Sequence, residues 1–282
     1  MANYYCMMAG LPDLELDDTQ PGVTFESFRE QCEEALTPAD ARLMSDFFYL
    51  RQDCANLVLL LKNPDAEISI WGNYSMEQFR DLITSATEMN FNVHRFPAFM
   101  SIFAREYNYN RDSRGFFPED ELLYQFFAFA IERCGNKFVR DWYRLNLDIT
   151  NILTALLARR QGWNVAEYIK GEGEVQEMIR ENKTKDFDLT HEYDYVKELM
   201  RIVDEPDPVR KEKMIDAFKW IWLDERTFFN PFSIESVFSY ACKLAIQYRW
   251  AKLDVEKGKE TFAQIIENLR GEARVPEEFA KA

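Results

Sequence analysis

The chain has 282 residues, of which 47% are hydrophobic and 15% aromatic, so it can bury a sizeable core without disulfides or metals. Its net charge is −15 and no strong basic run is visible, which disfavours binding to nucleic acid or, by charge alone, to an anionic membrane surface. Five widely spaced cysteines without a C-x-x-C pair indicate free thiols in a reducing compartment.

The sequence also argues against direct insertion into a membrane. The first residues lack the basic start and apolar core of a signal peptide. The longest purely apolar runs, such as Leu57 to Leu61, fall far below the roughly 18 residues that span a bilayer. We therefore expect a cytoplasmic chain that reaches a membrane only through a partner.

Helical periodicity dominates the first half of the chain. An apolar stripe with a capping Thr24 predicts a first helix that ends near Pro38, where a second pattern begins and runs to Asn63. The short segment from Ala66 to Gly72 is expected to be a loop or an extended piece. Further helices are predicted from Ser75, then across 97–107 and 118–134.

The second half continues the same pattern. Helices are predicted across 137–161, 165–181, 195–203, 209–223, 233–253 and 256–269. A polar stretch at 183–194 and the breaker Glu205 to Pro208 interrupt them. The helical pattern along the chain predicts an all-α fold. Because no linker is visible, we predict a single domain, residues 1–282, with internal repeats at about 24–110, 118–182 and 195–270.

The repeats share one helical plan. In the first copy Asp53 precedes Asn56 by one helical step, and in the second Asp148 precedes Asn151. Each pair is followed by a Leu-rich stretch that ends in basic residues. The third copy, Lys243 to Leu253, fits the plan but has Ala245 and Tyr248 at the two positions.

Each Asp–Asn pair points to one side of its helix, and on an apolar face it must find hydrogen-bond partners. The favoured interpretation is a buried structural pair that holds neighbouring helices in register. A pair that serves catalysis or metal binding is the alternative.

The helix of the second copy has a recognisable end. Gly162 suits the left-handed position after this helix, and Arg159 and Arg160 complement the dipole of the helix.

This arrangement of an acid-x-x-Asn helix, basic end, glycine and second helix resembles the repeated unit of the V-type (A/V-type) rotary ATPase socket. That family provides the central-stalk socket in prokaryotic and eukaryotic complexes alike. The resemblance rests on Asp148 to Ile169 and Pro231 to Leu269, with a weaker echo at Asp53 to Lys62. Residues Asn3 to Leu14 are more similar to a divergent bacterial family encoded beside V-type ATPase subunits.

The resemblance implies a funnel of three pseudo-equivalent helical bundles and a mechanical role. Such a central-stalk adaptor rests on the membrane proteolipid ring, receives the tip of the central shaft, and makes or breaks no bond. It implies a place peripheral to the inner face of the membrane, and no cofactor. The chain departs from the family pattern at Ala245, where relatives usually carry an acid, and it is shorter than typical members.

Catalytic and metal motifs are not found in the sequence. The two histidines, His94 and His191, have no His or Cys at ligand spacing, which argues against a histidine-rich metal site. The run Lys170 to Glu174 contains two glycines, but its acids would repel phosphate. Asp17 and Asp18 are adjacent acids that raise the alternative of an all-α Mg²⁺ enzyme, although a solvated loop is favoured.

Exposed aromatic residues are the remaining candidates for partner contacts. The run Phe228 to Phe232 lies in a breaker-rich segment, and we expect it to pack across bundles rather than form an exposed patch. Candidate partner contacts are Arg159, Arg160, Trp163 and Phe229. The main hypothesis is a rotary ATPase adaptor; an unrelated all-helical interaction module is the second, and the Mg²⁺ enzyme the third.

Overall fold

The computed structural model describes residues 4–17, 22–87, 95–113 and 117–252. Helices make up the regular structure of these ranges, which contain no strand, so the prediction of an all-α fold is confirmed. The first half of the chain holds α1 Tyr5–Gly10, α2 Phe25–Ala35, α3 Pro38–Leu43, the π-helical η1 Met44–Tyr49, α4 Leu50–Lys62, α5 Met76–Thr87 and α6 Ala98–Asn110. The second half holds α7 Pro118–Arg133, α8 Lys137–Arg160, the 3₁₀ turn η2 Val165–Glu167, α9 Glu174–Glu181, α10 Leu189–Glu192, α11 Tyr195–Asp204, α12 Pro208–Thr227 and α13 Ile234–Lys252.

Local capping explains where several helices begin. The Thr24 hydroxyl accepts a hydrogen bond from the Ser27 N–H and starts α2. Ser75 and Gln78 form a reciprocal capping box at α5, with the Ser75 N–H donating to Gln78 Oε1 at 2.8 Å. These starts, and the interruption of the helical pattern near Pro38 and Asn63, agree with the sequence predictions.

One predicted helix differs from the structure, two short helices were not predicted, and one predicted helix lies outside the described residues. The helix expected across 165–181 is only the short turn η2 and, after a loop, α9. The short helices α1 and α10 were not expected, and α10 lies inside the polar stretch at 183–194. The helix expected across 256–269 lies outside the described residues.

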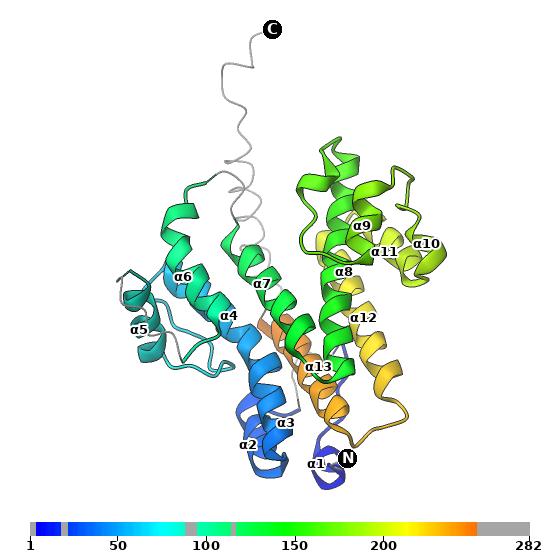
Figure 1. The fold of residues 1–282 in the computed structure, drawn as a ribbon. Helices are drawn as coiled ribbons and strands as arrows, with labels where there is room; N and C mark the ends of the chain where they lie inside the picture. The colour runs from blue at the N-terminus through cyan, green and yellow to red at the C-terminus, as the bar shows by residue number, and fades with distance from the viewer. Residues whose placement is uncertain (1–3, 18–21, 88–94, 114–116, 253–282) are drawn as a thin grey trace.

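The helices form two lobes joined by three central helices. Figure 1 shows α5 and α6 at one side and α9 to α12 at the other, with α7, α8 and α13 between them. The most extensive contacts between separate helices are of α7 with α8 and α4, of α11 with α8, and of α5 with α6, followed by α12 with α13. Because α3, η1 and α4 follow one another without a break, residues 38–62 act as one long rod.

Aromatic side chains fill the place where the central helices meet. Tyr143 of α8 is fully buried, and its hydroxyl donates to the backbone carbonyl of Phe47 in η1. Its ring packs edge-on against Phe126 of α7 and Phe238 of α13, with centroids 5.0 and 6.2 Å away. The helices α7, α8 and α13 and the segment η1 are thereby tied to a single core.

Candidate functional site

The first Asp–Asn pair lies in α4 and is fully buried, with exposed fractions of 0% for Asp53 and 1% for Asn56. The Asn56 amide donates to the Ser69 carbonyl at 2.8 Å and accepts from the Ser69 N–H at 3.0 Å. One side chain therefore pairs with both backbone groups of a loop residue, as a neighbouring β-strand does. We call this arrangement the Asn clamp.

Asp53 completes this junction between α4 and its following loop. Its carboxylate accepts from the Asn73 N–H at 2.9 Å, the Asn73 side-chain amide at 2.8 Å, and the Tyr74 N–H at 3.2 Å. Burial raises the pKa of Asp53 to about 6, although the hydrogen bonds from Asn73 and Tyr74 act in the opposite direction. The carboxylate thus anchors the loop immediately before α5.

A glycine makes this close approach feasible. A Cβ added to Gly72 would lie 2.1 Å from Oδ1 of Asp53, far inside van der Waals contact. The Arg29 guanidinium of α2 also donates to the Gly72 carbonyl at 2.9 Å. The sequence contains Gly72, but its spacing alone does not show which side chain would approach it.

The second pair, in α8, repeats the clamp. The Asn151 amide donates to the Lys170 carbonyl at 2.9 Å and accepts from the Lys170 N–H at 2.9 Å. It also donates to the Leu147 carbonyl within α8 at 3.1 Å. The clamped residue lies 19 positions after Asn151, whereas Ser69 lies 13 positions after Asn56. Both clamps therefore make the same two hydrogen bonds, although the chain between the asparagine and the clamped residue differs in length.

Asp148 uses side-chain partners in place of loop backbone. Gln176 of α9 donates to its carboxylate at 2.9 Å, and the Tyr195 hydroxyl of α11 also hydrogen-bonds to it. Burial raises the pKa of Asp148 to about 6, while the bond from Gln176 favours the charged form. Asp148 thus joins α8 to α9 and α11, and Gln176 was not singled out from the sequence.

The third position, in α13, holds a different segment. The Tyr248 hydroxyl accepts from the Phe25 N–H at 3.2 Å and donates to the Val23 carbonyl at 3.4 Å. The aromatic residue at the Asn position thus also pairs with backbone N–H and C=O groups. Its partners, however, come from the start of α2 instead of a following loop.

Two further side chains of α13 hold the segment that follows α1. The Gln247 amide donates to the Glu15 carbonyl at 2.6 Å, and the Tyr240 hydroxyl donates to the Pro12 carbonyl at 2.9 Å. These bonds join parts of the chain more than 220 positions apart. Sequence periodicity gives no signal for such distant pairs.

The carboxylates of Asp53 and Asp148 have neutral hydrogen-bond partners, which favours a structural part for them. Within the described ranges, no group of three or more His, Cys, Asp or Glu side chains is placed to hold a metal ion. Asp17 forms an exposed ion pair with Lys213 at 3.6 Å, and Asp18 lies outside the described residues, as does His94. Over the same ranges no helix is long and apolar enough to cross a membrane.

Arg159 and Arg160 make contacts within the chain. The Arg159 guanidinium donates to the carbonyls of Thr184 and Asn182 and lies over the Phe187 ring, 3.7 Å from its centroid. Arg160 pairs with Asp204 and donates to the Val203 carbonyl at 3.1 Å. The two arginines tie the end of α8 to the segments around α10 and α11.

The turn after α8 exposes a large aromatic side chain. Gly162 has φ of 70°, and hydrogen bonds from its N–H to Arg159 and from the Trp163 N–H to Ala158 close a Schellman motif. Trp163 is 55% exposed and stacks on Tyr168 with ring centroids 5.4 Å apart. Of the three candidate contacts in this region, Trp163 presents the largest apolar surface.

The connection between α12 and α13 differs from its prediction. Phe228 and Phe229 are 74% and 87% exposed, so the expectation that they pack across bundles is wrong. The fifth residue of the run, Phe232, packs edge-on against Tyr5 with centroids 4.7 Å apart. The inner face of α12 packs against α13 and α11. The two phenylalanines lie in the turn after that packed helix, and their side chains face outward.

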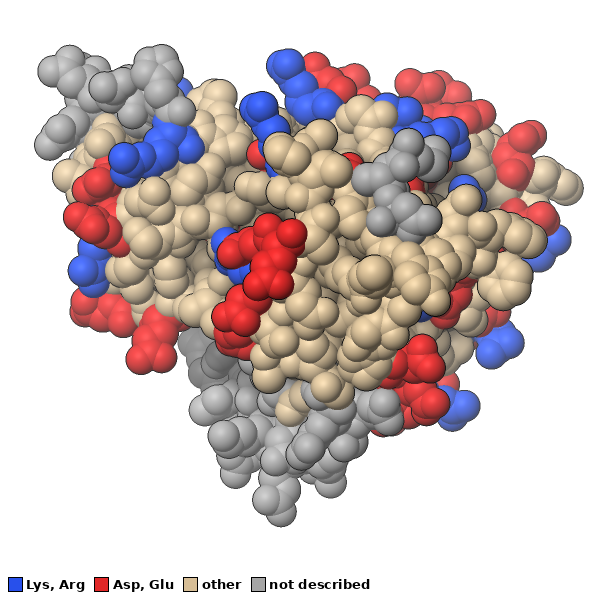
Figure 2. Space-filling model, turned by 90° about the horizontal axis from the view of Figure 1, so that it is seen from below, with Lys and Arg blue, Asp and Glu red and all other residues tan. Residues whose placement is uncertain are grey.

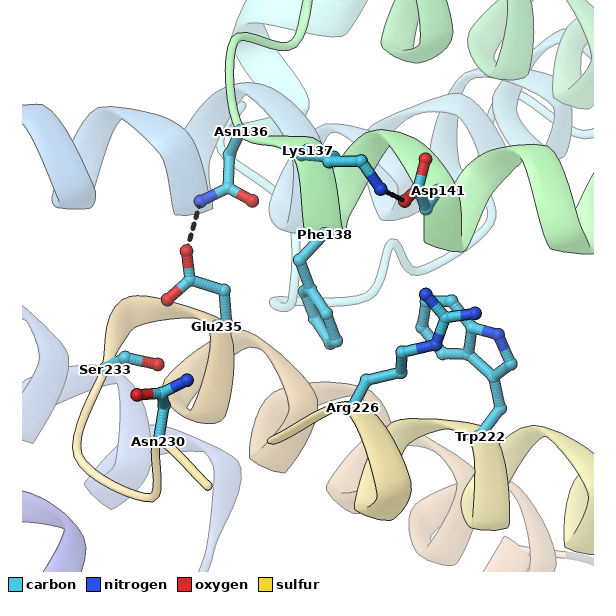
Figure 3. Close-up of a pocket in the computed structure, with 9 residues that line it drawn as sticks. All are labelled: Asn136, Lys137, Phe138, Asp141, Trp222, Arg226, Asn230, Ser233 and Glu235. Atoms are coloured by element: carbon cyan, nitrogen blue, oxygen red, sulfur yellow. Dashed lines mark hydrogen bonds and ion pairs between the residues drawn. The ribbon is translucent and has the colours of Figure 1, made fainter. Parts of the chain in front are cut away.

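A pocket of about 300 Å³ lies beside this connection, between the starts of α8 and α13 and the end of α12. Figure 3 shows the Asn136 amide directed at Glu235, with a nitrogen–oxygen distance of 2.7 Å. Phe138 and Trp222 form an apolar wall, and the Arg226 guanidinium lies over the Trp222 ring, 4.8 Å from its centroid. The pocket combines aromatic faces with charged groups of both signs.

Comparison with known protein families gives a match over nearly the whole chain. The sequence model of a family described as "Protein of unknown function (DUF2764)" matches residues 1–273. No curated protein and no solved structure matches the chain. The family match covers the three repeated helices and both Asn clamps.

Proposed function

The chain belongs to the DUF2764 family, and we propose that it is a non-catalytic central-stalk adaptor of a V-type rotary ATPase. In this role it couples the central shaft to the membrane proteolipid ring at the inner face of the membrane. The proposal assigns the chain no reaction, no cofactor and no direct insertion into the bilayer.

The observation that carries the proposal is the repetition of one junction along the chain. Asn56 and Asn151 occupy equivalent places in α4 and α8, and each clamps one loop residue through its backbone N–H and C=O. Tyr248 stands at the equivalent place in α13 and also bonds to a backbone N–H and a backbone C=O. The repeated helices are the same segments that resemble the socket of rotary ATPases.

The mechanical properties of these junctions suit a part that transmits torque. A clamp with two hydrogen bonds and a buried carboxylate holds its loop in one geometry, because releasing it leaves buried polar groups unpaired. The long helices that carry the junctions meet at the Tyr143 core. A load applied at one lobe is therefore passed through packed helices, since close-packed interiors transmit strain.

Affinity purification of the tagged chain from gently solubilised membranes tests the proposal. We expect proteolipid-ring and central-shaft proteins to copurify in stoichiometric amounts, as identified by mass spectrometry. A parallel purification with an unrelated acidic helical protein carrying the same tag controls for adhesion. Recovery of the chain with unrelated soluble proteins alone would contradict the proposal and favour the helical interaction module.

A further inference from the structure

One end of the molecule carries a group of aromatic side chains drawn from α1 and from the connection between α12 and α13. We call Tyr5, Phe228, Phe229 and Phe232 the aromatic end; the first three are exposed and the fourth is half-buried. Tyr5 lies in α1, and the other three lie between α12 and α13. The Tyr4 N–H donates to the Phe232 carbonyl at 2.8 Å, which brings the two segments together. In Figure 1 both segments lie at the lower end of the molecule.

The segment that carries these side chains is held by its own hydrogen bonds. The Asn230 N–H donates to the Thr227 carbonyl at 3.0 Å, and the Ser236 hydroxyl donates to the Asn230 carbonyl at 2.6 Å. The Ser233 N–H donates to the same carbonyl at 3.3 Å. Phe228 and Phe229 are therefore presented from an ordered turn, which reduces the entropy lost when such side chains dock.

The pocket shares this turn, because Asn230 and Ser233 line it. Its cations are engaged: Lys137 pairs with Asp141 at 2.7 Å, and Arg226 lies over Trp222. Glu235 is held by the neutral Asn136 amide, and no cation of the described residues lies within ion-pair distance of it. The pocket thus offers one carboxylate, beside an apolar wall, for an incoming basic side chain.

The charges on this face indicate the sign of a partner. Figure 2 shows the face from below with a broad uncharged area, crossed on one side by a run of Asp and Glu and bordered by residues of both signs. The whole chain carries a net charge of −15. A partner that covers the uncharged area is therefore favoured if its own border is basic, because complementary charges speed association and disfavour other partners.

We propose that the aromatic end docks on the membrane-embedded ring, through ring loops that carry Lys or Arg beside apolar side chains. The inference rests on the proposed function, and it adds which surface of the chain faces the ring. Loops on the inner side of a membrane carry an excess of Lys and Arg, which complements the net charge of −15 and the run of Asp and Glu on this face. Aromatic side chains, Phe and Tyr among them, are enriched in the buried cores of protein interfaces.

The test uses the full-length tagged chain in native membranes, with ring and shaft proteins measured separately after gentle solubilisation. The variant Phe228→Ser/Phe229→Ser is expected to retain the shaft and to lose the ring by at least about tenfold, since removing interface aromatics costs upwards of about 1.4 kcal/mol. The variant Glu235→Gln keeps the acceptor for Asn136 and removes the charge. We expect it to weaken ring retention and to reduce its dependence on salt.

The matched control is Tyr109→Ser/Phe117→Ser, which removes two exposed aromatics at the α6–α7 connection, at the other end of the molecule. This variant is expected to retain both partners. Thermal unfolding checks that all variants fold, and substitutions at such exposed positions are expected to shift the melting temperature by no more than about 2 °C.

The outcomes separate the two proposals. If the wild-type chain recovers neither ring nor shaft, the proposed function fails and this inference fails with it. If the wild type recovers both and Phe228→Ser/Phe229→Ser still retains the ring, or loses the shaft in its place, only the docking surface is overturned. Binding of the purified chain to protein-free phosphatidylcholine–phosphatidylglycerol vesicles, abolished by the same variant, would instead assign the aromatic end to lipid and overturn the inference.

Discussion

At the scale of single residues, the side-chain amides of Asn56 and Asn151 each hydrogen-bond to the backbone N–H and C=O of one loop residue. The backbone of a neighbouring β-strand makes the same pair of bonds. An amide is suited to this task because it carries a donor and an acceptor side by side. An aspartate at the same place lacks the donor, and its second oxygen would face the carbonyl of Ser69 or Lys170. The identity of the side chain, and not only its polarity, therefore decides whether the clamp forms.

We predict that Asn56→Asp and Asn151→Asp each lower the free energy of unfolding by about 2 to 4 kcal/mol, because each buries an uncompensated charge against a carbonyl. Urea unfolding followed by circular dichroism measures this change. Asn110→Asp, at an exposed position at the end of α6, is the matched control and is expected to change the value by less than about 0.5 kcal/mol. Equal effects at all three positions would contradict the assignment of the clamps.

The raised pKa of the buried Asp148 carboxyl predicts a dependence of stability on pH. Burial raises the pKa of Asp148 to about 6 in the folded chain, above its ordinary value of 3.8, so the folded state binds the proton more tightly than the unfolded state. The stability that this group contributes is therefore fully present below about pH 4 and is lost as the pH rises through about 6. Arg144 nearby favours the charged form and reduces the shift.

The variant Asp148→Asn removes this titration while keeping an oxygen that accepts from Gln176. Its free energy of unfolding relative to wild type is expected to improve by up to about 3 kcal/mol between pH 4 and pH 7, from a shift of about two pKa units. Urea unfolding at the two pH values measures the difference. A constant offset between wild type and variant across this range would show that the carboxyl is not perturbed in the folded chain.

The residue scale also shows what the sequence can and cannot predict. The one-step spacing of Asp53 and Asn56 on an apolar helix predicts that both are buried and hydrogen-bonded, and the structure has them so. Their partners cannot be predicted from spacing, because the clamped residue is set by the path of the loop. The distance along the chain from Asn to clamped residue is 13 positions for Ser69 and 19 for Lys170.

At the scale of elements, the helix expected across 165–181 fails for a physical reason. The clamp draws the backbone of Lys170 into a bond with Asn151, which is incompatible with a helical N–H to C=O ladder at that point. Gly171 then takes φ of 77°, and Gly173 takes φ of 153°, both outside helical geometry. The apolar periodicity before and after the loop is the pattern of one continuous helix. The long-range hydrogen bond between Lys170 and Asn151 interrupts that helix, and the local pattern does not reveal it.

The loop before α5 gives a sharp test at this scale. We predict that Gly72→Ala lowers the free energy of unfolding by about 2 to 4 kcal/mol, because its Cβ would displace Asp53 from Asn73 and Tyr74. The control Gly135→Ala adds the same methyl group where nothing lies within 4 Å. It is expected to be neutral or to stabilise by up to about 1 kcal/mol.

Chemical denaturation of both glycine variants, with wild type alongside, makes this comparison. If Gly72→Ala proves as stable as Gly135→Ala, the loop has room to move away from α4, and the Asp53 junction is not the rigid anchor that we describe. A loss confined to Gly72→Ala supports a junction that fixes the start of α5 to α4.

At the scale of the whole molecule, the repeats are joined by contacts that no local pattern contains. Tyr143 ties α8 to η1 through the Phe47 carbonyl, and α13 binds the segment after α1 through Tyr240 and Gln247. The all-helical character and the ends of α2, α4 and α5 that carry caps or breakers follow from periodicity and caps, which are local, whereas the loop between η2 and α9 does not. The lobes, and the exposure of Phe228 and Phe229, depend on which helix faces are already covered, and only the folded chain determines that.

The adaptor account has a consequence for the entire motor. If the chain transmits torque between shaft and ring, its removal is expected to uncouple ATP hydrolysis from ion movement. ATP hydrolysis by the soluble motor should then continue without driving ions through the ring. On this account catalysis lies in the soluble motor and ion passage at the ring, and the chain would serve only to couple them. Rigidity at the two clamps is then a requirement of coupling as well as of folding.

The measurement that tests this claim most directly is ATP-driven ion uptake by membrane vesicles from cells in which the gene for this chain is deleted. We predict that uptake is lost while ATP hydrolysis by the soluble motor persists, and that adding back the purified chain restores uptake. Restoration should be impaired by Asn56→Asp/Asn151→Asp and unaffected by Asn110→Asp. Vesicles that lack the chain and still pump ions at the wild-type rate would contradict the account.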